Sequence, residues 1–307
     1  MEYISIGGKL PGVSRVVMGC MRIGAMDEKS MDELIDAALA SGINAFDHAD
    51  IYGGGESERR FGNVLREHPS LRDRMFIQSK CGIKEGEYDF SREHILSSVD
   101  GILKRLSIDN LDLLILHRPD VLGEPEEVAE AFDELKSSGK VRAFGASNMS
   151  ACQLEMYNRV LGENRFLADQ LQLSCAHTLL VDEGFNVNMT VPAGTVRTGG
   201  TLEYCRMNGI TIQSWSTLQY GFFEGTFLNN REKYPELNRK LDELAAKYGV
   251  TAGAIATAFV LRIPGVGQAV IGSTKPARIR ELAEAGSITL THSEWYELYR
   301  SAGNRLP

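Results

Sequence analysis

The sequence predicts an α/β fold, and within that class a (β/α)8 TIM barrel in which residues 1–307 form a single domain. Short apolar runs of β-type alternate with longer segments of helical periodicity along the chain, which gives eight strand–helix units. The short runs are almost continuously apolar, as expected for parallel strands that are buried on both faces. A doubly wound sheet is the second choice, because it has the same alternation of elements.

The expected strands are short and apolar, and several of them end in a polar or aromatic residue. They span residues 15–21, 43–49, 74–80, 111–117, 140–148, 166–173, 210–216 and 268–273. The residues that end or directly follow a strand are Asp47, Lys80, His117, Ser147, Asn148, Gln170, Trp215 and Ser273. In a barrel the carboxyl ends of all strands lie at one end, so we expect these side chains to gather there.

The expected helices lie between the strands. They span residues 27–42, from Ser57 on, 91–107, from Glu124 on, 150–162, 200–208, 231–248, 251–262, from Pro276 on, and 293–300. In the first of them the apolar residues Met31, Leu34, Ile35 and Ala38 keep the spacing of one helical face. Ser91 is a favourable N-cap for the third, since its hydroxyl can accept a hydrogen bond from the first turn.

The least regular segment is residues 178–200, which is rich in Gly, Asn and Thr and predicts a long loop. Long loops in compact domains are often functional or mobile. A surface insertion without a role is an equally good interpretation, and both stay open at this point.

Composition limits the classes of partner. The chain is 43% hydrophobic and 24% charged, as is usual for a globular protein, and its net charge is −8. No cluster of Lys and Arg is visible, which argues against a nucleic-acid-binding surface. We expect a small-molecule substrate and no nucleic-acid partner.

The sequence also indicates a cytoplasmic protein without a membrane partner. The first residues lack the apolar core of a signal peptide, and no window approaches the ~18 consecutive apolar residues that span a bilayer. The five cysteines are scattered and form no CxxC pair, so neither a disulfide framework nor a structural zinc site is expected.

The stretch FDHADIYGGGES, residues 46–57, holds several proton-bearing side chains and allows three interpretations. A metal site is weakly supported, because Asp47 and His48 are adjacent in a strand and should point to opposite faces. A phosphate loop is also weakly supported, because GGGES matches neither GxGxxG nor GxxxxGK[ST]. The glycines are better explained by a tight turn, after which Ser57 would cap the next helix.

The third interpretation is an acid–base site completed by residues from other strands. Lys80 directly follows an apolar strand, and a buried ammonium group needs a carboxylate partner, for which Asp47 is well placed. A positive Lys80 would lower the pKa of a neighbouring Tyr52 from ~10 and make it a workable general acid. His117 ends the following strand and would join them.

Several motifs together resemble the aldo-keto reductase family in content, order and spacing. They are FDHADIYG, SK at 79–80, SREHILSSVDGILKRLSIDNLDLLILHRPD, GASN, LADQLQLS, QSWSTL and IGSTKPARI. The resemblance extends from about residue 7 to residue 286, and it implies a (β/α)8 barrel that binds NADPH without a Rossmann fold. It also implies an NADPH-dependent reduction of aldehyde or ketone carbonyls.

The resemblance implies a role for each candidate catalytic residue. Tyr52 matches the proton donor to the carbonyl oxygen, and Lys80 matches the group that lowers the Tyr52 pKa. Asp47 matches the carboxylate that pairs with Lys80, and His117 the residue that orients the carbonyl. No metal is implied.

The resemblance assigns a second set of residues to NADPH. Ser147, Asn148 and Gln170 match the groups that hold the nicotinamide carboxamide, and Trp215 the aromatic residue that stacks on the ring. Ser216 and Leu218 begin the loop over the pyrophosphate. The remaining positions lie in the segment that grips the 2′-phosphate and adenine: Gly272, Ser273, Thr274, Lys275, Arg278 and Glu281.

The chain departs from the family pattern at Thr217, where Pro is common, and at Gly272, where Lys is common. The second departure leaves Lys275 and Arg278 as the main charges for the 2′-phosphate. An NADPH-binding redox sensor with weak turnover is the alternative to an enzyme, and a phosphosugar isomerase is a third hypothesis.

Overall fold

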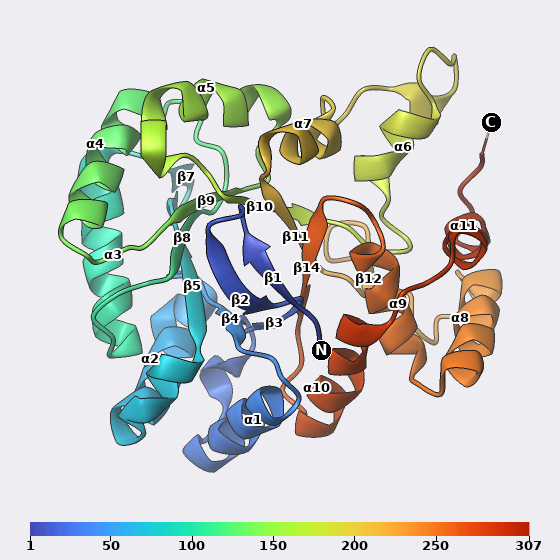
Figure 1. The fold of residues 1–307 in the computed structure, drawn as a ribbon, viewed down its shortest axis with the longest axis horizontal. Coiled ribbons are helices and arrows are strands. Elements are labelled where there is room, and N and C mark those ends of the chain that lie inside the picture. The colour runs from blue at the N-terminus through green and yellow to red at the C-terminus, as the bar shows by residue number, and fades with distance from the viewer. Residues whose placement is uncertain (307) are drawn as a thin grey trace.

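Eight parallel strands close into a barrel at the centre of the molecule, and helices surround it (Figure 1). The structure is a computed structural model that describes residues 1–306. The barrel strands are β3 (Val16–Gly19), β4 (Ala45–Asp47), β5 (Phe76–Cys81), β8 (Leu113–Leu116), β9 (Phe144–Ser147), β10 (Ala168–Gln172), β11 (Thr211–Trp215) and β14 (Val266–Ile271). They follow this order around the barrel, and β14 pairs with β3 to close it. The predicted (β/α)8 fold is confirmed, and the doubly wound alternative is excluded because the sheet closes on itself.

Most strands are shorter than predicted, because apolar character reports burial and not hydrogen bonding along a ladder. The segment expected at 140–148 pairs as a strand only over Phe144–Ser147. Val141 is buried, yet it forms only an isolated bridge with Leu111. The apolar run therefore continues beyond the paired part of the strand.

The helices form a ring outside the barrel (Figure 1). They are α1 (Glu28–Ala40), α2 (Glu56–Glu67), α3 (Arg92–Leu106), α4 (Pro125–Ser137), α5 (Ala151–Leu161), α6 (Leu179–Phe185), α7 (Thr201–Asn208), α8 (Pro235–Tyr248), α9 (Ala252–Leu261), α10 (Pro276–Ala283) and α11 (His292–Ser301). The predicted cap of α3 is confirmed, since the Ser91 hydroxyl accepts a hydrogen bond from the backbone N–H of His94. Helix α8 begins at Pro235 and not at 231, as expected from the preference for proline in a first turn.

The glycine run before α2 forms a tight turn, as predicted, but the expected cap at Ser57 is wrong. Gly53, Gly54 and Gly55 have φ values of 59°, 64° and 87°, a left-handed region that residues with a Cβ seldom adopt. Gly55 takes the N-cap position and α2 begins at Glu56. The helix thus begins earlier than the capping rule suggests. The buried Ser57 hydroxyl donates a hydrogen bond to the backbone oxygen of Met21 instead.

Segment 178–200 is only partly the long loop expected from its composition. It begins with α6 and contains a short 3-10 turn at Pro192–Gly194. Phe185 of α6 packs against Tyr299 of α11, with ring centroids 5.2 Å apart, and the Tyr299 hydroxyl donates to Asp182 at 2.8 Å. These contacts dock the segment on α11, which the local composition could not indicate.

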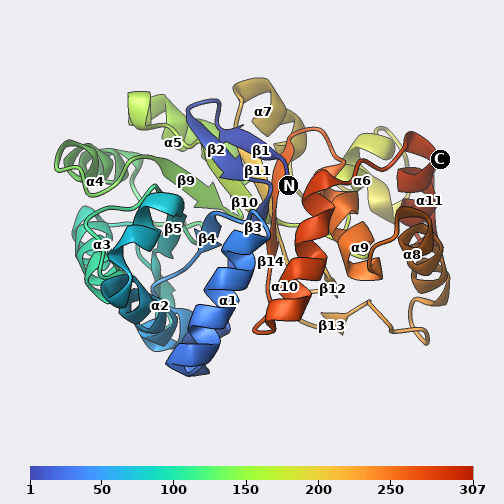
Figure 2. The ribbon, with the colours of Figure 1, turned by 60° about the horizontal axis from the view of Figure 1, so that its bottom comes forward.

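Three hairpins that the sequence did not predict lie at the two ends of the barrel. The first, β1 (Tyr3–Ile6) with β2 (Leu10–Ser14), packs Ile6, Leu10 and Val13 on apolar residues of the barrel interior. The second and third follow β5 and β11: β6 (Ile83–Lys84) with β7 (Glu87–Tyr88), and β12 (Gln219–Tyr220) with β13 (Gly225–Thr226). Figure 2 shows the first and the third at opposite ends of the barrel. The amino end is therefore covered, which leaves the carboxyl end for ligands.

Within residues 1–306, no single helix has the length and hydropathy needed to cross a membrane, and α8 and α9 meet them only together, as a pair bent by 94°. Every residue of α9 after Ala252 is buried in the fold. The expectation that all 307 residues form one domain stays a prediction.

Gly62→Ala should lower the free energy of unfolding by about 1–3 kcal/mol. A Cβ at Gly62 would lie 2.1 Å from the backbone oxygen of Arg105, so α2 and α3 would have to separate. Urea unfolding followed by circular dichroism measures the change.

Gly101→Ala in α3 is the matched control. Its Cβ would meet only the mobile end of the Arg105 side chain, at 2.9 Å, and alanine favours helix by up to about 1 kcal/mol. Equal destabilisation by both substitutions would contradict the close packing of α2 on α3.

Candidate active site

Lys80 is the centre of a buried polar cluster at the carboxyl end of β5. Its side chain has no exposed surface, and its Nζ donates three hydrogen bonds. The acceptors are the Asp47 carboxylate at 2.7 Å, the His48 backbone oxygen at 2.8 Å and the Tyr52 hydroxyl at 3.1 Å. All three protons of the ammonium group are thus satisfied, which is what a buried charge requires.

The predicted pairing of Asp47 and Lys80 follows from the barrel register. Strands β4 and β5 are neighbours, and Asp47 stands opposite Gln78, two residues before Lys80. Burial alone lowers the pKa of Lys80, but Asp47 and Tyr52 raise it more, so the pKa lies above its ordinary value. Lys80 therefore stays positively charged at neutral pH.

Tyr52 begins the glycine turn after β4, and its hydroxyl faces Lys80. Burial raises the pKa of Tyr52, and Lys80 offsets only part of this effect while Asp47 adds to it. The expectation that Lys80 brings this pKa below its ordinary value is wrong for this structure, because desolvation of the phenolate outweighs the ammonium charge. Tyr52 is accordingly a protonated phenol at neutral pH.

His117 directly follows β8 and lies beside Tyr52, with ring centroids 5.9 Å apart and planes nearly perpendicular. Burial and the charges of Lys80 and Arg118 hold the pKa of His117 well below its ordinary value. The neutral ring keeps one N–H donor, and its buried Nδ1 has no hydrogen-bond partner within residues 1–306. His117 can thus donate to a neutral oxygen without adding a charge.

His48 and Asp50 do not join Asp47 in a common site. The His48 ring packs edge-on against Phe61, with centroids 4.6 Å apart, and burial lowers the pKa of His48 to about 3. Burial raises the pKa of Asp50 to about 7. Among the described residues, no three His, Cys, Asp or Glu side chains are placed to hold a metal ion.

A network of glutamine amides lies in the barrel interior below Lys80. Of these glutamines, the sequence predicted a functional role only for Gln170. Asp47 accepts from the amides of Gln78 at 2.6 Å and Gln170 at 3.0 Å. Gln213 accepts from both amides at 3.0 Å, and donates to Gln78 and Gln268 at 2.8 Å. The signal was a glutamine inside an otherwise apolar strand, two residues from Lys80 and so on the same face.

The residues expected at the nicotinamide lie together beside His117. Asn148, with φ of 59°, donates to Ser147 Oγ at 2.7 Å and accepts from Trp215 Nε1 at 3.2 Å. Ser147 Oγ in turn donates to the backbone oxygen of Gln170 at 2.8 Å. These contacts join β9, β10 and β11 at one edge of the site, although the Gln170 amide itself is directed toward Asp47.

The residues expected at the phosphates lie on two loops. Ser216 donates to Gln219 Oε1 at 3.0 Å, and the backbone oxygen of Leu218 accepts from Thr226 at 2.9 Å, so both begin the β12–β13 hairpin. The other loop joins β14 to α10 and carries Gly272, Ser273, Thr274 and Lys275, while Arg278 and Glu281 lie in α10 itself.

The loop before α10 has the charge pattern of an anion site. Lys275 is the N-cap residue of α10 and Arg278 lies in its first turn, and both are exposed. Within residues 1–306 neither side chain forms an ion pair. A lysine is unfavourable at this position, because the N-terminus of a helix carries a partial positive charge. A Cβ at Gly272 would meet nothing within 4 Å, so the backbone is open there. This donor set fits a dianionic phosphate, as in the 2′-phosphate of NADPH.

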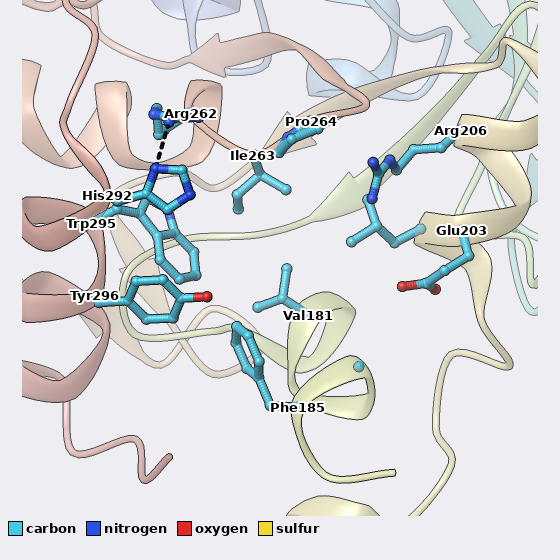
Figure 3. Close-up of a pocket in the computed structure, with 12 residues that line it drawn as sticks. Val181, Phe185, Glu203, Arg206, Arg262, Ile263, Pro264, His292, Trp295 and Tyr296 are labelled. Carbon is cyan, nitrogen blue, oxygen red and sulfur yellow. Dashed lines mark hydrogen bonds between the residues drawn. The ribbon is translucent and has the colours of Figure 1, made fainter. Parts of the chain in front are cut away.

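A cavity of about 340 Å³ lies outside this cluster, between α6, α7 and α11 (Figure 3). Phe185, Val181 and Tyr296 form its apolar side, and Glu203 and Arg206 its charged side. Its described lining includes none of the residues around Lys80, so it is separate from the candidate active site.

The chain as a whole is similar to known proteins. The model of the aldo/keto reductase family matches residues 15–301. The chain belongs to the aldo/keto reductase family. The oxidoreductase YdhF of Escherichia coli and a 6-dehydroglucose reductase of Agrobacterium fabrum are each 34% identical to it, and each alignment covers 98% of both chains.

A solved structure of another aldo-keto reductase has the same fold. The thermostable aldo-keto reductase Tm1743, in complex with the inhibitor epalrestat, is similar to the chain with a TM-score of 0.78 and 25% identity. The alignment covers 98% of this chain and 100% of the other. The protein is therefore an oxidoreductase of a family that reduces carbonyl groups and generally uses nicotinamide cofactors.

Gln213→Leu should lower the free energy of unfolding by about 1–3 kcal/mol for each amide that it leaves unpaired. The amides of Gln78, Gln170 and Gln268 all bond Gln213 in the dry barrel interior. Urea unfolding provides the measurement.

Ser214→Ala, one residue further along β11, is the matched control. It removes a single hydrogen bond, from Ser214 Oγ to the backbone oxygen of Leu173, and should cost about 1 kcal/mol. An effect of Gln213→Leu no larger than this would contradict a connected network.

Proposed function

We propose that the protein reduces aldehyde or ketone carbonyls with NADPH and that Tyr52 donates the proton. The observation that carries this proposal is the set of contacts at Lys80 Nζ, which joins the Asp47 carboxylate to the Tyr52 hydroxyl. When bound, NADPH would supply a hydride to the carbonyl carbon. The residues of the chain then have to hold the carbonyl oxygen and protonate it.

Tyr52 would transfer its phenolic proton to the carbonyl oxygen as negative charge develops there. The charge left on the phenolate is stabilised by the Lys80 ammonium group, 3.1 Å from the hydroxyl oxygen in the resting state. Asp47 keeps Lys80 oriented, and the raised pKa of Lys80 ensures that it is charged. The neutral His117 would donate a hydrogen bond that orients the carbonyl.

The proposal also assigns roles to the expected cofactor residues. Ser147, Asn148 and Gln170 would hold the nicotinamide carboxamide, and Trp215 would stack on the ring. Lys275 and Arg278 would bind the 2′-phosphate, since they are exposed, positively charged and close to a helix N-terminus.

The test is a mixture of the protein, NADPH and a panel of aldehydes, ketones and quinones, with the absorbance of the reduced nicotinamide as the readout. We expect oxidation of NADPH with at least one carbonyl class. Tight NADPH binding without oxidation by any member would contradict the enzyme and favour the redox sensor.

Tyr52→Phe should reduce kcat by about 10²–10⁴-fold, because the ring remains but the transferable proton is lost. The dissociation constant for NADPH, measured by fluorescence, should stay within about twofold, since the hydroxyl bonds Lys80 in the structure. An equal loss of NADPH binding would count against the role as donor.

Arg278→Ala should weaken NADPH binding by about 10- to 100-fold and leave NADH binding nearly unchanged, because a charge-assisted hydrogen bond contributes about 1.5–3 kcal/mol. Arg280→Ala is the matched control, since Arg280 is an exposed arginine on the same helix. Parallel losses for both cofactors, or equal effects of the two substitutions, would refute recognition of the 2′-phosphate by Arg278.

A further inference from the structure

Arg118 is a second positive charge at the carboxyl end of the barrel, next to His117 in the chain. Two aromatic rings hold its guanidinium: the central carbon lies 5.7 Å from the Trp215 centroid and 5.5 Å from the Phe222 centroid. Contacts of this kind stabilise an arginine by about 0.5–2 kcal/mol. The side chain is thus kept in place beside the candidate active site.

The charge of Arg118 has no counter-ion within residues 1–306. The nearest acid along the chain, Asp120, forms no ion pair with Arg118 and accepts instead from the backbone N–H groups of Phe90 and Leu122, both at 2.9 Å. Lys84, on the hairpin that follows β5, is by contrast paired with Glu87 and Asp89. Arg118 is therefore held in place by aromatic rings and half-buried, and no acidic side chain within residues 1–306 neutralises its charge.

A half-buried guanidinium without a counter-ion is unfavourable in free energy, and a bound anion would offset this cost. Burial lowers the pKa of Arg118, but a guanidinium remains charged in proteins. Only the phenols of Tyr88 and Tyr52 offset the effect of burial on that pKa. A planar guanidinium presents paired N–H donors that match the two oxygens of a carboxylate or phosphate.

Exposed apolar side chains also lie at this end of the barrel. Val121, Leu122, Phe222 and Phe223 are exposed on the loops after β8 and β11. Exposed apolar side chains grouped on loops at the functional end of a barrel indicate contact with a ligand. A ligand here would meet apolar surface, one guanidinium, and the Tyr52–His117 pair.

We propose that Arg118 binds an oxyanion of the substrate, so that the preferred substrates are aldehydes or ketones that also carry a carboxylate or phosphate group. This proposal rests on the proposed function, because it places the carbonyl at Tyr52 and His117 and the anion at Arg118. Arg118 is thus a specificity-determining residue, and takes no part in the proton transfer.

The test compares matched substrates that differ only in charge. They are para-carboxybenzaldehyde and succinate semialdehyde, each beside its neutral methyl ester. Arg118→Gln should reduce kcat/KM for the acids by about 10- to 100-fold and for the esters by less than about threefold. Arg118→Lys should recover part of the activity with the acids, and high salt should weaken the preference of the wild type.

Lys84→Gln is the control for net charge, since it removes one exposed positive charge that is already paired. It should leave the ratio of acid to ester unchanged. Equal losses for acids and esters in Arg118→Gln, or a wild type without preference for acids, would overturn the proposal. So would a change in the ratio with Lys84→Gln as large as that with Arg118→Gln.

A binding measurement separates this proposal from the proposed function. The chain has two tryptophans, and Trp215 is the one in contact with Arg118, so its fluorescence should report an anion bound there. Benzoate and inorganic phosphate should change the fluorescence of the wild type saturably, and that of Arg118→Gln far less. If neither acids nor esters are reduced, the proposed function fails; the titration still tests Arg118, and identical curves for the two proteins would overturn it.

Discussion

The buried ammonium group of Lys80 is the constraint on which the rest of the site depends. A charge without exposed surface is tolerated only where oxygen acceptors satisfy each of its protons. Closure of the barrel provides them, because β4 lies beside β5 and delivers the Asp47 carboxylate and the His48 backbone oxygen from one strand end. The glycine turn then brings Tyr52 back over the same ammonium group.

Two layers of the barrel interior support this arrangement. The β1–β2 hairpin and apolar strand residues fill the amino end, and a layer of glutamine amides lies above them. The amides of Gln78 and Gln170 also donate hydrogen bonds to the Asp47 carboxylate, so its orientation does not depend on Lys80 alone. In a dry interior such a network is rigid when all its members are paired.

Protonation states at the carboxyl end follow from the competition between burial and charge. Burial has the larger effect on the pKa of Tyr52 and of His117, so these are a protonated phenol and a neutral imidazole. At Lys80 the Asp47 carboxylate and the Tyr52 phenol together outweigh burial and raise the pKa. Arg118 adds a second positive charge to this end. Although the chain has a net charge of −8, Lys80 places a positive charge beside the Tyr52 hydroxyl, where the proposed reaction develops negative charge.

The order of apolar runs determined the barrel, because eight such runs separated by helical segments bury their faces in few other ways. The position of Asp47, Lys80 and His117 at strand ends was also readable, since parallel strands place their carboxyl ends together. The sequence did not reveal the docking of α6 on α11, the glutamine network or the place of Arg118 against two aromatic rings. It also suggested a lowered Tyr52 pKa, where burial raises it. These features depend on which side chains from distant segments meet and how much water they exclude, and only the tertiary structure decided that.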